Sequence, residues 1–213
     1  YGLENIHPIY WSDKLLKLYE SGIIDSYIDK NGRDVEQYHK YKDKFFNLWK
    51  IFSEKFKQRS LTVEINILEK LRLYERYFSP QVHSKNGNTD YSKIGASGID
   101  SLIIAYDSLL ISLINKDDEH GIKFEKLSDQ FKSDSKIDIE KKVANTKLSW
   151  EKLVVHSMLH VGDSDSTGTI AASWFGAYQG FKGVPEINYK FIEFYTEINY
   201  LSEKLYNKFK DAP

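Results

Sequence analysis

The sequence predicts an all-α protein. Apolar residues recur every three or four positions along most of the chain, which is the period of an α-helix. Capping residues and glycines stand where these periodic runs begin and end. No series of short alternating segments indicates a sheet, and no heptad repeat indicates a coiled coil. The chain has 213 residues, of which 41% are hydrophobic, so it is long enough to bury one sizeable core.

The first periodic segments lie in the N-terminal third of the chain. Residues 12–22 begin with Ser12, a favourable N-cap, and end at Gly22, so a short amphipathic helix is expected there. KNGRD, residues 30–34, indicates a turn. A long helix is expected over residues 35–57. The apolar stripe of this helix consists of Phe45, Leu48, Trp49, Phe52 and Phe56.

A third helix is expected over residues 62–78, and its predicted buried positions are Ile65, Leu68, Leu71 and Leu73. Residues 79–98 are polar and interrupted by proline and glycine, so they are expected to form a long loop. Long loops in compact domains are often functional. Residues 100–114 are apolar on nearly all sides, which predicts a central, buried helix.

The pattern changes over residues 116–147, which are highly charged and contain few large apolar side chains. This segment is expected to be an exposed insertion. Apolar helical spacing returns over residues 150–161, and a terminal amphipathic helix is expected over residues 188–209.

Composition excludes several function classes. Thirty basic and thirty-one acidic residues are interspersed and give a net charge of -1, so neither nucleic acid nor an anionic membrane is an expected partner. No apolar run approaches the ~20 residues that a membrane span needs. The chain contains no cysteine, which excludes disulfides and thiolate metal sites. A cytoplasmic location is expected, and the mitochondrion is an alternative.

The chemistry-bearing motif is GDSDSTG, residues 162–168. Asp163 and Asp165 lie close together in the chain, which is unfavourable for two negative charges unless a cation or good solvation offsets their repulsion. With Ser166 they supply three oxygen ligands of the kind that hard divalent cations prefer. The alternative is a capping cluster for a helix that begins near Thr167. The small residues that follow the motif would allow neighbouring elements to approach closely, which favours the metal site.

Three other interpretations of this region fit less well. An EF-hand loop requires Glu at its twelfth position, where this chain has Trp174. The D-x-D-x-T motif of haloacid-dehalogenase-like phosphatases precedes a long α/β domain, whereas fewer than fifty residues follow it here. His156 and His160 have the spacing of zinc ligands, but the motif lacks the general-base Glu. One or both histidines are therefore expected on the face of a helix.

Two motifs resemble one known family. HVGDSDSTGTIAASWFGAYQGFKGVP, residues 160–185, is similar to the C-terminal signature of the ADP-ribosylglycohydrolases, and most similar to their ADP-ribosylarginine hydrolase branch. GASGIDSLIIAYDSLL, residues 95–110, resembles a second motif of the same branch, in the same order. The resemblance extends in outline over residues 11–206. It implies that residues 1–213 are the C-terminal part of one all-α helical bundle.

The resemblance also implies a reaction, namely Mg²⁺-dependent hydrolysis of the N-glycosidic bond between ADP-ribose and a protein arginine, with two Mg²⁺ ions in the complete site. The implied metal-ligand positions are Asp163, Asp165 and Ser166. The implied substrate-binding positions are Ser97 and Gly98, together with Tyr91 and Ser92 after a one-residue deletion. The expected partners are ADP-ribose or an ADP-ribosylated protein.

Departures from the family pattern leave an alternative open. The family's acidic catalytic residue and remaining metal ligands lie in an N-terminal half, in a Ser/Thr-Asp-Asp motif that this chain lacks. The chain is therefore expected to supply half of an active site, to be inactive alone, and to need an N-terminal half in the same or another chain. Ile99 in place of a family His, and the 116–147 insertion, favour the alternative of an inactive scaffold or an ADP-ribose-binding module.

Overall fold

The computed structural model describes residues 7–57, 60, 67–83, 88–113 and 148–210. Helices make up most of these ranges, and within them bridged β-structure is limited to one isolated bridge between His83 and Thr89. The all-α prediction is thus confirmed. Residues 1–180 and 181–213 form two compact units. The expected insertion over residues 116–147 lies outside the described residues.

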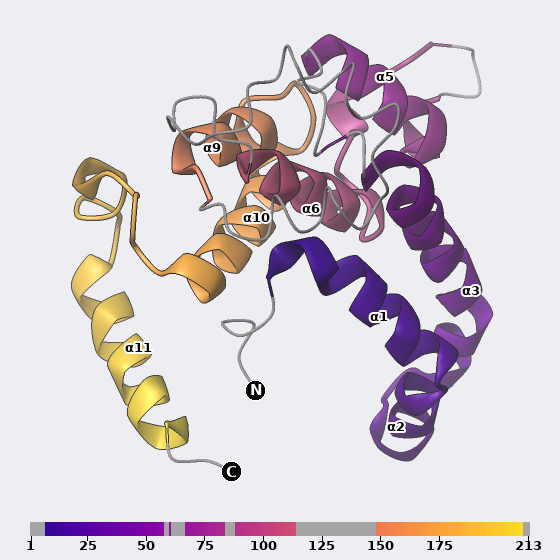
Figure 1. The fold of residues 1–213 in the computed structure, drawn as a ribbon, viewed down its shortest axis with the longest axis horizontal. Helices are drawn as coiled ribbons and strands as arrows, with labels where there is room; N and C mark the ends of the chain where they lie inside the picture. Colours follow the sequence, from indigo (N-terminus) through magenta and orange to yellow (C-terminus); the bar gives the residue numbers. More distant parts are fainter. Residues whose placement is uncertain (1–6, 58–59, 61–66, 84–87, 114–147, 211–213) are drawn as a thin grey trace, which may run out of the picture. The chain divides into compact units, whose positions relative to one another are not determined.

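The N-terminal helices are α1 (Trp11–Glu20), α2 (Ile23–Asn31) and α3 (Val35–Ile51), and α1 contacts both of the others (Figure 1). The turn predicted at KNGRD is confirmed over residues 32–34, which separate α2 from α3, but the sequence did not predict α2 itself. Gly22 separates α1 from α2 with φ 71°, a left-handed conformation that glycine adopts without strain.

Ser12 is not the cap of α1, contrary to the prediction. A 3₁₀ turn, Pro8–Tyr10, leads directly into the helix, so Ser12 lies within its first turn and is fully buried. Its hydroxyl lies 3.2 Å from the Ser53 hydroxyl. A serine so placed needs a partner inside the core, and Ser53 supplies it from a segment that is distant in the chain.

The long helix predicted over 35–57 is confirmed in outline, but its last part, Phe52–Phe56, is a π-helical turn. Lys57 follows this turn, is 1% exposed, and pairs with Asp13 of α1 at 2.9 Å. The wider turn therefore ends where a partly buried ion pair connects the extension of α3 to α1.

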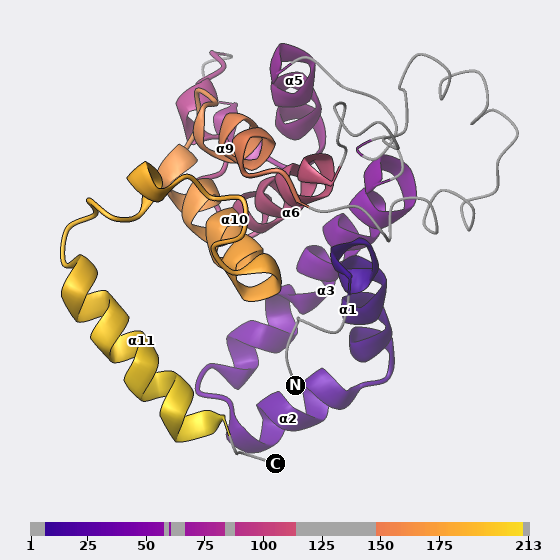
Figure 2. The same ribbon diagram turned by 60° about the vertical axis from the view of Figure 1, so that its left-hand side comes forward.

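The centre of the first unit is α6 (Asp100–Ser112), in which every residue except Leu102 is buried. It packs against α9 (Trp150–Met158) and α10 (Ser164–Gln179), which also pack on each other (Figure 2). The prediction of a central helix is confirmed. A helix that is apolar on nearly all sides has no face suited to water, so neighbours must surround it.

The predicted buried face of the third helix is partly wrong. The helix is α5 (Ile67–Tyr77), and Leu71 is buried, but Leu68 is 64% exposed and Leu73 is half-buried. Ile65 lies outside the described residues. Lys70 and Tyr74 are buried instead. The hydrophobic pattern does not predict this face correctly, because it does not show that α6 supplies a polar partner for Lys70.

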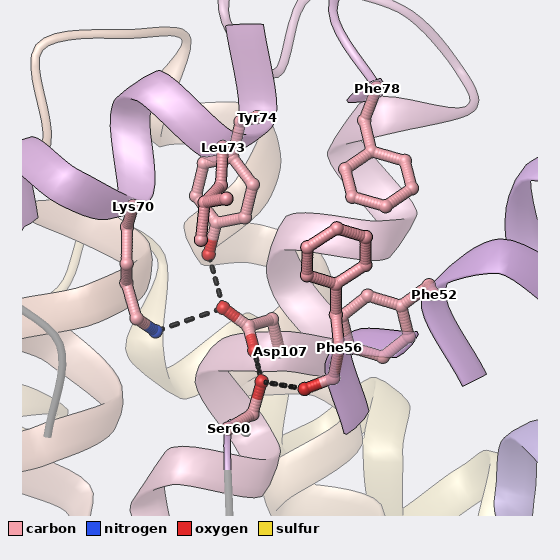
Figure 3. Close-up of a pocket in the computed structure, with 8 residues that line it drawn as sticks. All are labelled: Phe52, Phe56, Ser60, Lys70, Leu73, Tyr74, Phe78 and Asp107. Carbon is pink, nitrogen blue, oxygen red and sulfur yellow. Dashed lines mark hydrogen bonds and ion pairs between the residues drawn. The ribbon is translucent and has the colours of Figure 1, made fainter. Parts of the chain in front are cut away.

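That partner is Asp107, whose carboxylate lies 2.9 Å from Lys70 Nζ and also accepts hydrogen bonds from the hydroxyls of Tyr74 and Ser60 (Figure 3). The group borders a cavity of about 10 Å³. Burial alone would raise the pKa of Asp107, but the Lys70 charge and the three hydrogen bonds lower it overall. Burial also raises the pKa of Tyr74 well above its usual value.

The second unit contains a 3₁₀ turn, Glu186–Asn188, and α11 (Tyr195–Phe209). The terminal helix therefore begins seven residues later than the expected residue 188. None of the helices in the described part of the chain combines the length and apolar character needed to cross a membrane.

Replacing the buried cation tests the importance of the Asp107 cluster. We expect Lys70→Met to lower the free energy of unfolding by about 3 kcal/mol, because it leaves an uncompensated buried carboxylate. Urea unfolding followed by circular dichroism measures this. Lys50→Met is the control, since Lys50 is 54% exposed and pairs with Glu54 at 3.9 Å, and it should cost less than about 1 kcal/mol. Equal losses in both variants would contradict the prediction.

Candidate functional site

An open pocket of about 500 Å³ lies where the loop before α6 meets the start of α10. It is lined by Gly95, Ala96, Ser97, Gly98, Ser101, Asp165, Ser166, Thr169 and Ile170. Its volume is within the range of ~300–1,000 Å³ that is typical of small-molecule sites. The two motifs singled out in the sequence thus form the walls of one pocket.

Backbone packing holds these two motifs together. The Asp163 N–H donates a hydrogen bond to the Ile94 carbonyl at 2.7 Å. A Cβ atom on Gly162 would lie 2.2 Å from the same carbonyl oxygen, which is closer than any side chain can approach. Gly95 has φ +84°, and a Cβ there would lie 2.8 Å from Thr167 Cγ2. Both glycines are therefore required for this approach.

The acidic motif begins α10 three residues earlier than predicted. Asp163 is the N-cap, and Asp165 and Ser166 lie in the first turn. A hydrogen bond that the protonated Asp163 carboxyl donates to Asp165, followed by the backbone N–H groups of Ser166 and Asp165, lowers the pKa of Asp165. The start of a helix stabilises negative charge, so the crowded acids occupy a favourable position.

Residues 93–213 match the family model for ADP-ribosylglycohydrolase. The chain belongs to the ADP-ribosylglycohydrolase family. It is 30% identical over 220 residues to ADP-ribosylhydrolase ARH1 of Dictyostelium discoideum. The aligned region covers 97% of this chain and 47% of that protein. It is also 30% identical over 209 residues to the candidate ADP-ribosyl glycohydrolase L444 of Acanthamoeba polyphaga mimivirus, which covers 94% of this chain and 32% of that protein.

The chain thus spans about half the length of the Dictyostelium relative and about a third of the mimivirus relative. No solved structure matches it significantly. The family resemblance recognised from the two motifs is confirmed, and the helical fold described above is that of an ADP-ribosylglycohydrolase chain.

The described part of this ADP-ribosylglycohydrolase supplies some of the oxygen donors that a hard divalent cation needs. Asp163, Asp165 and Ser166 share one helix start, and carboxylate and hydroxyl oxygens suit Mg²⁺ or a similar ion. Within the described ranges, no three His, Cys, Asp or Glu side chains gather closely enough to hold a metal ion. The donor chemistry fits Mg²⁺, and Mg²⁺ bound here would draw its other ligands from water or from other segments.

The four predicted substrate positions fall into two places. Ser97 and Gly98 line the pocket with Asp165 and Ser166. Tyr91 and Ser92 belong to a separate exposed 3₁₀ turn, Tyr91–Lys93, and do not line this pocket. The Ser92 backbone N–H and hydroxyl both bind Asp90, at 3.2 and 2.5 Å. A hydrogen bond with Glu75 raises the pKa of Tyr91.

His160 lies beyond the end of α9, which stops at Met158, whereas His156 lies within that helix, so the prediction that one or both histidines lie on a helix holds for His156 alone. The Gly162 N–H donates to its Nδ1 at 3.0 Å, and its Nε2 lies 2.8 Å from the buried Thr167 hydroxyl. That hydroxyl donates to the Ser157 carbonyl at 2.7 Å. The neutral ring with its proton on Nε2 satisfies all three bonds.

Burial lowers the pKa of His160, and the charge of Asp163 and a backbone hydrogen bond with Ser157 act in the opposite direction. If Nδ1 carried a proton, two hydrogen-bond donors, Nδ1–H and the Gly162 N–H, would face each other, which is unfavourable. Both effects favour the neutral ring. His160 therefore braces the turn that leads into the acidic motif.

Sequence reasoning missed two side chains that shape this site, His160 in its bracing role and Asp100 at the start of α6. Asp100 is fully buried and accepts hydrogen bonds from the Gly95 and Ser97 backbone at 2.9 and 2.8 Å. A carboxylate that follows a glycine-rich loop and opens an otherwise apolar helix was the available signal. Its partners could not be read from the spacing.

Glycine substitutions test the backbone contact. We expect Gly162→Ala to lower the free energy of unfolding by about 2 kcal/mol or more, because the new Cβ overlaps the Ile94 carbonyl. Gly176→Ala on α10 is the control. No atom lies within 4 Å of its added Cβ, so it should raise stability by about 0.5–1 kcal/mol. Chemical denaturation of both variants checks the opposite signs, and a stabilising Gly162→Ala would refute the contact.

The His160 bonds predict a pH dependence. Its pKa in the folded chain lies below the usual value of 6.5, so below that pH the unfolded chain binds more protons than the folded one. The stabilisation is therefore complete above pH ~6.5 and is lost as the pH falls through the interval down to the folded pKa. We expect His160→Gln to reduce this slope in pH-dependent urea unfolding. His39→Gln, at an exposed ion pair with Asp29, is the comparison. Identical slopes for wild type and His160→Gln would contradict the assignment.

Proposed function

We propose that this chain supplies half of the active site of a Mg²⁺-dependent ADP-ribosylarginine hydrolase. One observation carries the proposal: Asp165 and Ser166 of the acidic motif share a pocket with Ser97 and Gly98 of the upstream motif. Membership of the ADP-ribosylglycohydrolase family and the similarity to a protein named ADP-ribosylhydrolase support it. Arginine as the attachment point rests on the likeness of both motifs to that branch.

Each wall of the pocket has a proposed role. Asp163, Asp165 and Ser166 would hold Mg²⁺, two ions being expected in the complete site. Bound Mg²⁺ supplies Lewis-acid chemistry, polarising the ribose hydroxyls and a water. Ser97 and Gly98 precede α6 and line the pocket together with Ser101 of its first turn. Small polar side chains and an exposed glycine backbone suit the polar groups of ADP-ribose, so this wall would orient the substrate.

Proton transfer is assigned to an N-terminal half, in the same chain or another, because this chain lacks the family's Ser/Thr-Asp-Asp motif. The chain alone would be inactive. The partners we propose are ADP-ribose, an ADP-ribosylated protein and that N-terminal half, and the proposed compartment is the cytoplasm.

A second candidate function is an ADP-ribose-binding module or scaffold without catalysis. It is favoured by Ile99, which stands at the N-cap of α6 where the family has His. Isoleucine offers no side-chain hydrogen bond to the pocket or the helix start. Binding of ADP-ribose without hydrolysis of ADP-ribosyl-arginine, in the presence of the N-terminal half and Mg²⁺, would favour this candidate over the hydrolase.

Calorimetric titration of ADP-ribose into the full-length protein, with and without Mg²⁺, tests the proposal. We expect Mg²⁺-dependent binding in the wild type and a loss of about tenfold or more in affinity for Asp165→Ala, because a charged ligand position is removed. Ser164→Ala is the matched control, since it lies between the two acids but does not line the pocket. Binding that is indifferent to Mg²⁺ and to Asp165→Ala would refute the metal assignment.

A further inference from the structure

Asp100 connects more segments than a helix cap requires. Its Oδ1 accepts from the Ser97 N–H at 2.8 Å and the Ser97 hydroxyl at 2.6 Å, and the Asp100 N–H returns a bond to that hydroxyl at 3.3 Å. This reciprocal pair has the form of a capping box and lies just before and at Asp100, the first residue of α6. Its Oδ2, however, takes no part in the capping box.

The second oxygen binds residues outside the helix start. Oδ2 accepts from the Gly95 N–H at 2.9 Å, from the Ser79 hydroxyl at 2.6 Å and from the Gln81 side-chain amide. Asp100 and Ser79 are both fully buried. The Gln81 amide also donates to the Lys93 carbonyl at 3.0 Å. The carboxyl thus fixes the loop before α6 against the segment that follows α5.

One peptide unit carries this constraint to the acidic motif. The Ile94–Gly95 peptide donates through its N–H to Asp100, and its carbonyl accepts from the Asp163 N–H at 2.7 Å. Hydrogen bonds at both ends of an amide polarise and strengthen each other. Gly162 and Gly95 allow the two backbones to come into contact at this peptide. Asp100 and the N-cap of α10 are therefore joined through a single amide.

We infer that Asp100 is a positioning residue that sets the placement of the substrate-binding loop relative to the Asp163–Asp165 pair. Asp100 itself does not line the pocket, whereas its neighbours Ser97, Gly98 and Ser101 do. The expected effect of Asp100 on ADP-ribose affinity rests on the proposed function. The clamp itself, Asp100 to the Ile94–Gly95 peptide to Asp163, is testable without any ligand.

Asp107 provides the matched control. It is a second buried carboxyl on α6, and its hydrogen-bond partners are Ser60, Lys70 and Tyr74, none of which lines the pocket. Asp100→Asn and Asp107→Asn both replace a buried carboxyl by an amide of nearly the same shape. Both should reduce stability, but only Asp100→Asn should alter the loop and the pocket.

The experiment is residue-resolved amide hydrogen exchange on the full-length protein, combined with ADP-ribose titration in the presence of Mg²⁺. For Asp100→Asn we expect faster exchange at the Gly95, Ser97 and Asp163 amides, and an affinity weakened by about tenfold or more. For Asp107→Asn we expect these amides and the affinity to stay close to wild type. Ser79→Ala, which keeps the carboxyl and removes one of its donors, should give a smaller change in the same direction even if Asp100→Asn does not fold.

Several outcomes would overturn the inference. Unchanged exchange at Gly95 and Asp163 in Asp100→Asn and in Ser79→Ala would remove the clamp. Equal loss of affinity in Asp100→Asn and Asp107→Asn would mean that Asp100 acts only through the overall stability of the fold. Wild-type protein that binds no ADP-ribose would refute the proposed function instead. In that case coupled acceleration at the Gly95 and Asp163 amides would still support the clamp, and its absence would overturn it.

Discussion

The burial of two carboxyl groups on α6 constrains the rest of the first unit. Asp100 and Asp107 are seven residues apart, about two helical turns, so they emerge from nearly the same side of the helix. A buried carboxyl is costly unless donors surround it. Each therefore gathers a different set of segments: Asp107 draws in Ser60 and α5, and Asp100 draws in the residues after α5 and the loop before α6. The two buried carboxyl groups of this otherwise apolar helix thus select several of the segments that pack on it.

The candidate site is a consequence of this arrangement. The loop held by Asp100 presents Ser97 and Gly98 to the pocket, and its Ile94 carbonyl receives the Asp163 amide. Glycine is needed on both sides, since a side chain at either position would separate the two backbones. The acids at the start of α10 gain from the local N–H groups, which offset part of the repulsion between them. The loop before α6 and the acidic motif are thereby held next to each other.

Family membership and the incomplete donor set bear on different questions. The match over residues 93–213 places the chain among the ADP-ribosylglycohydrolases. The relatives are longer, and this chain covers 47% and 32% of them. A site built from Asp163, Asp165 and Ser166 has the donor chemistry of a magnesium site and leaves coordination positions open for other ligands. The half-site proposal accounts for both observations, since the same pocket can be a complete recognition surface and an incomplete catalytic one.

The sequence by itself determined the all-α class, the central position of α6 and the pairing of an acidic motif with an upstream loop, because these follow from local periodicity and from motifs that are contiguous in the chain. It did not determine the buried face of α5, where Lys70 lies inside and Leu68 outside, or the roles of Ser12, His160 and Asp100. Those depend on partners far away in the chain: Asp107 for Lys70, Ser53 for Ser12, Ser79 and Gln81 for Asp100. A buried polar group is acceptable only when its donors arrive from elsewhere, and only the tertiary structure decides which ones do.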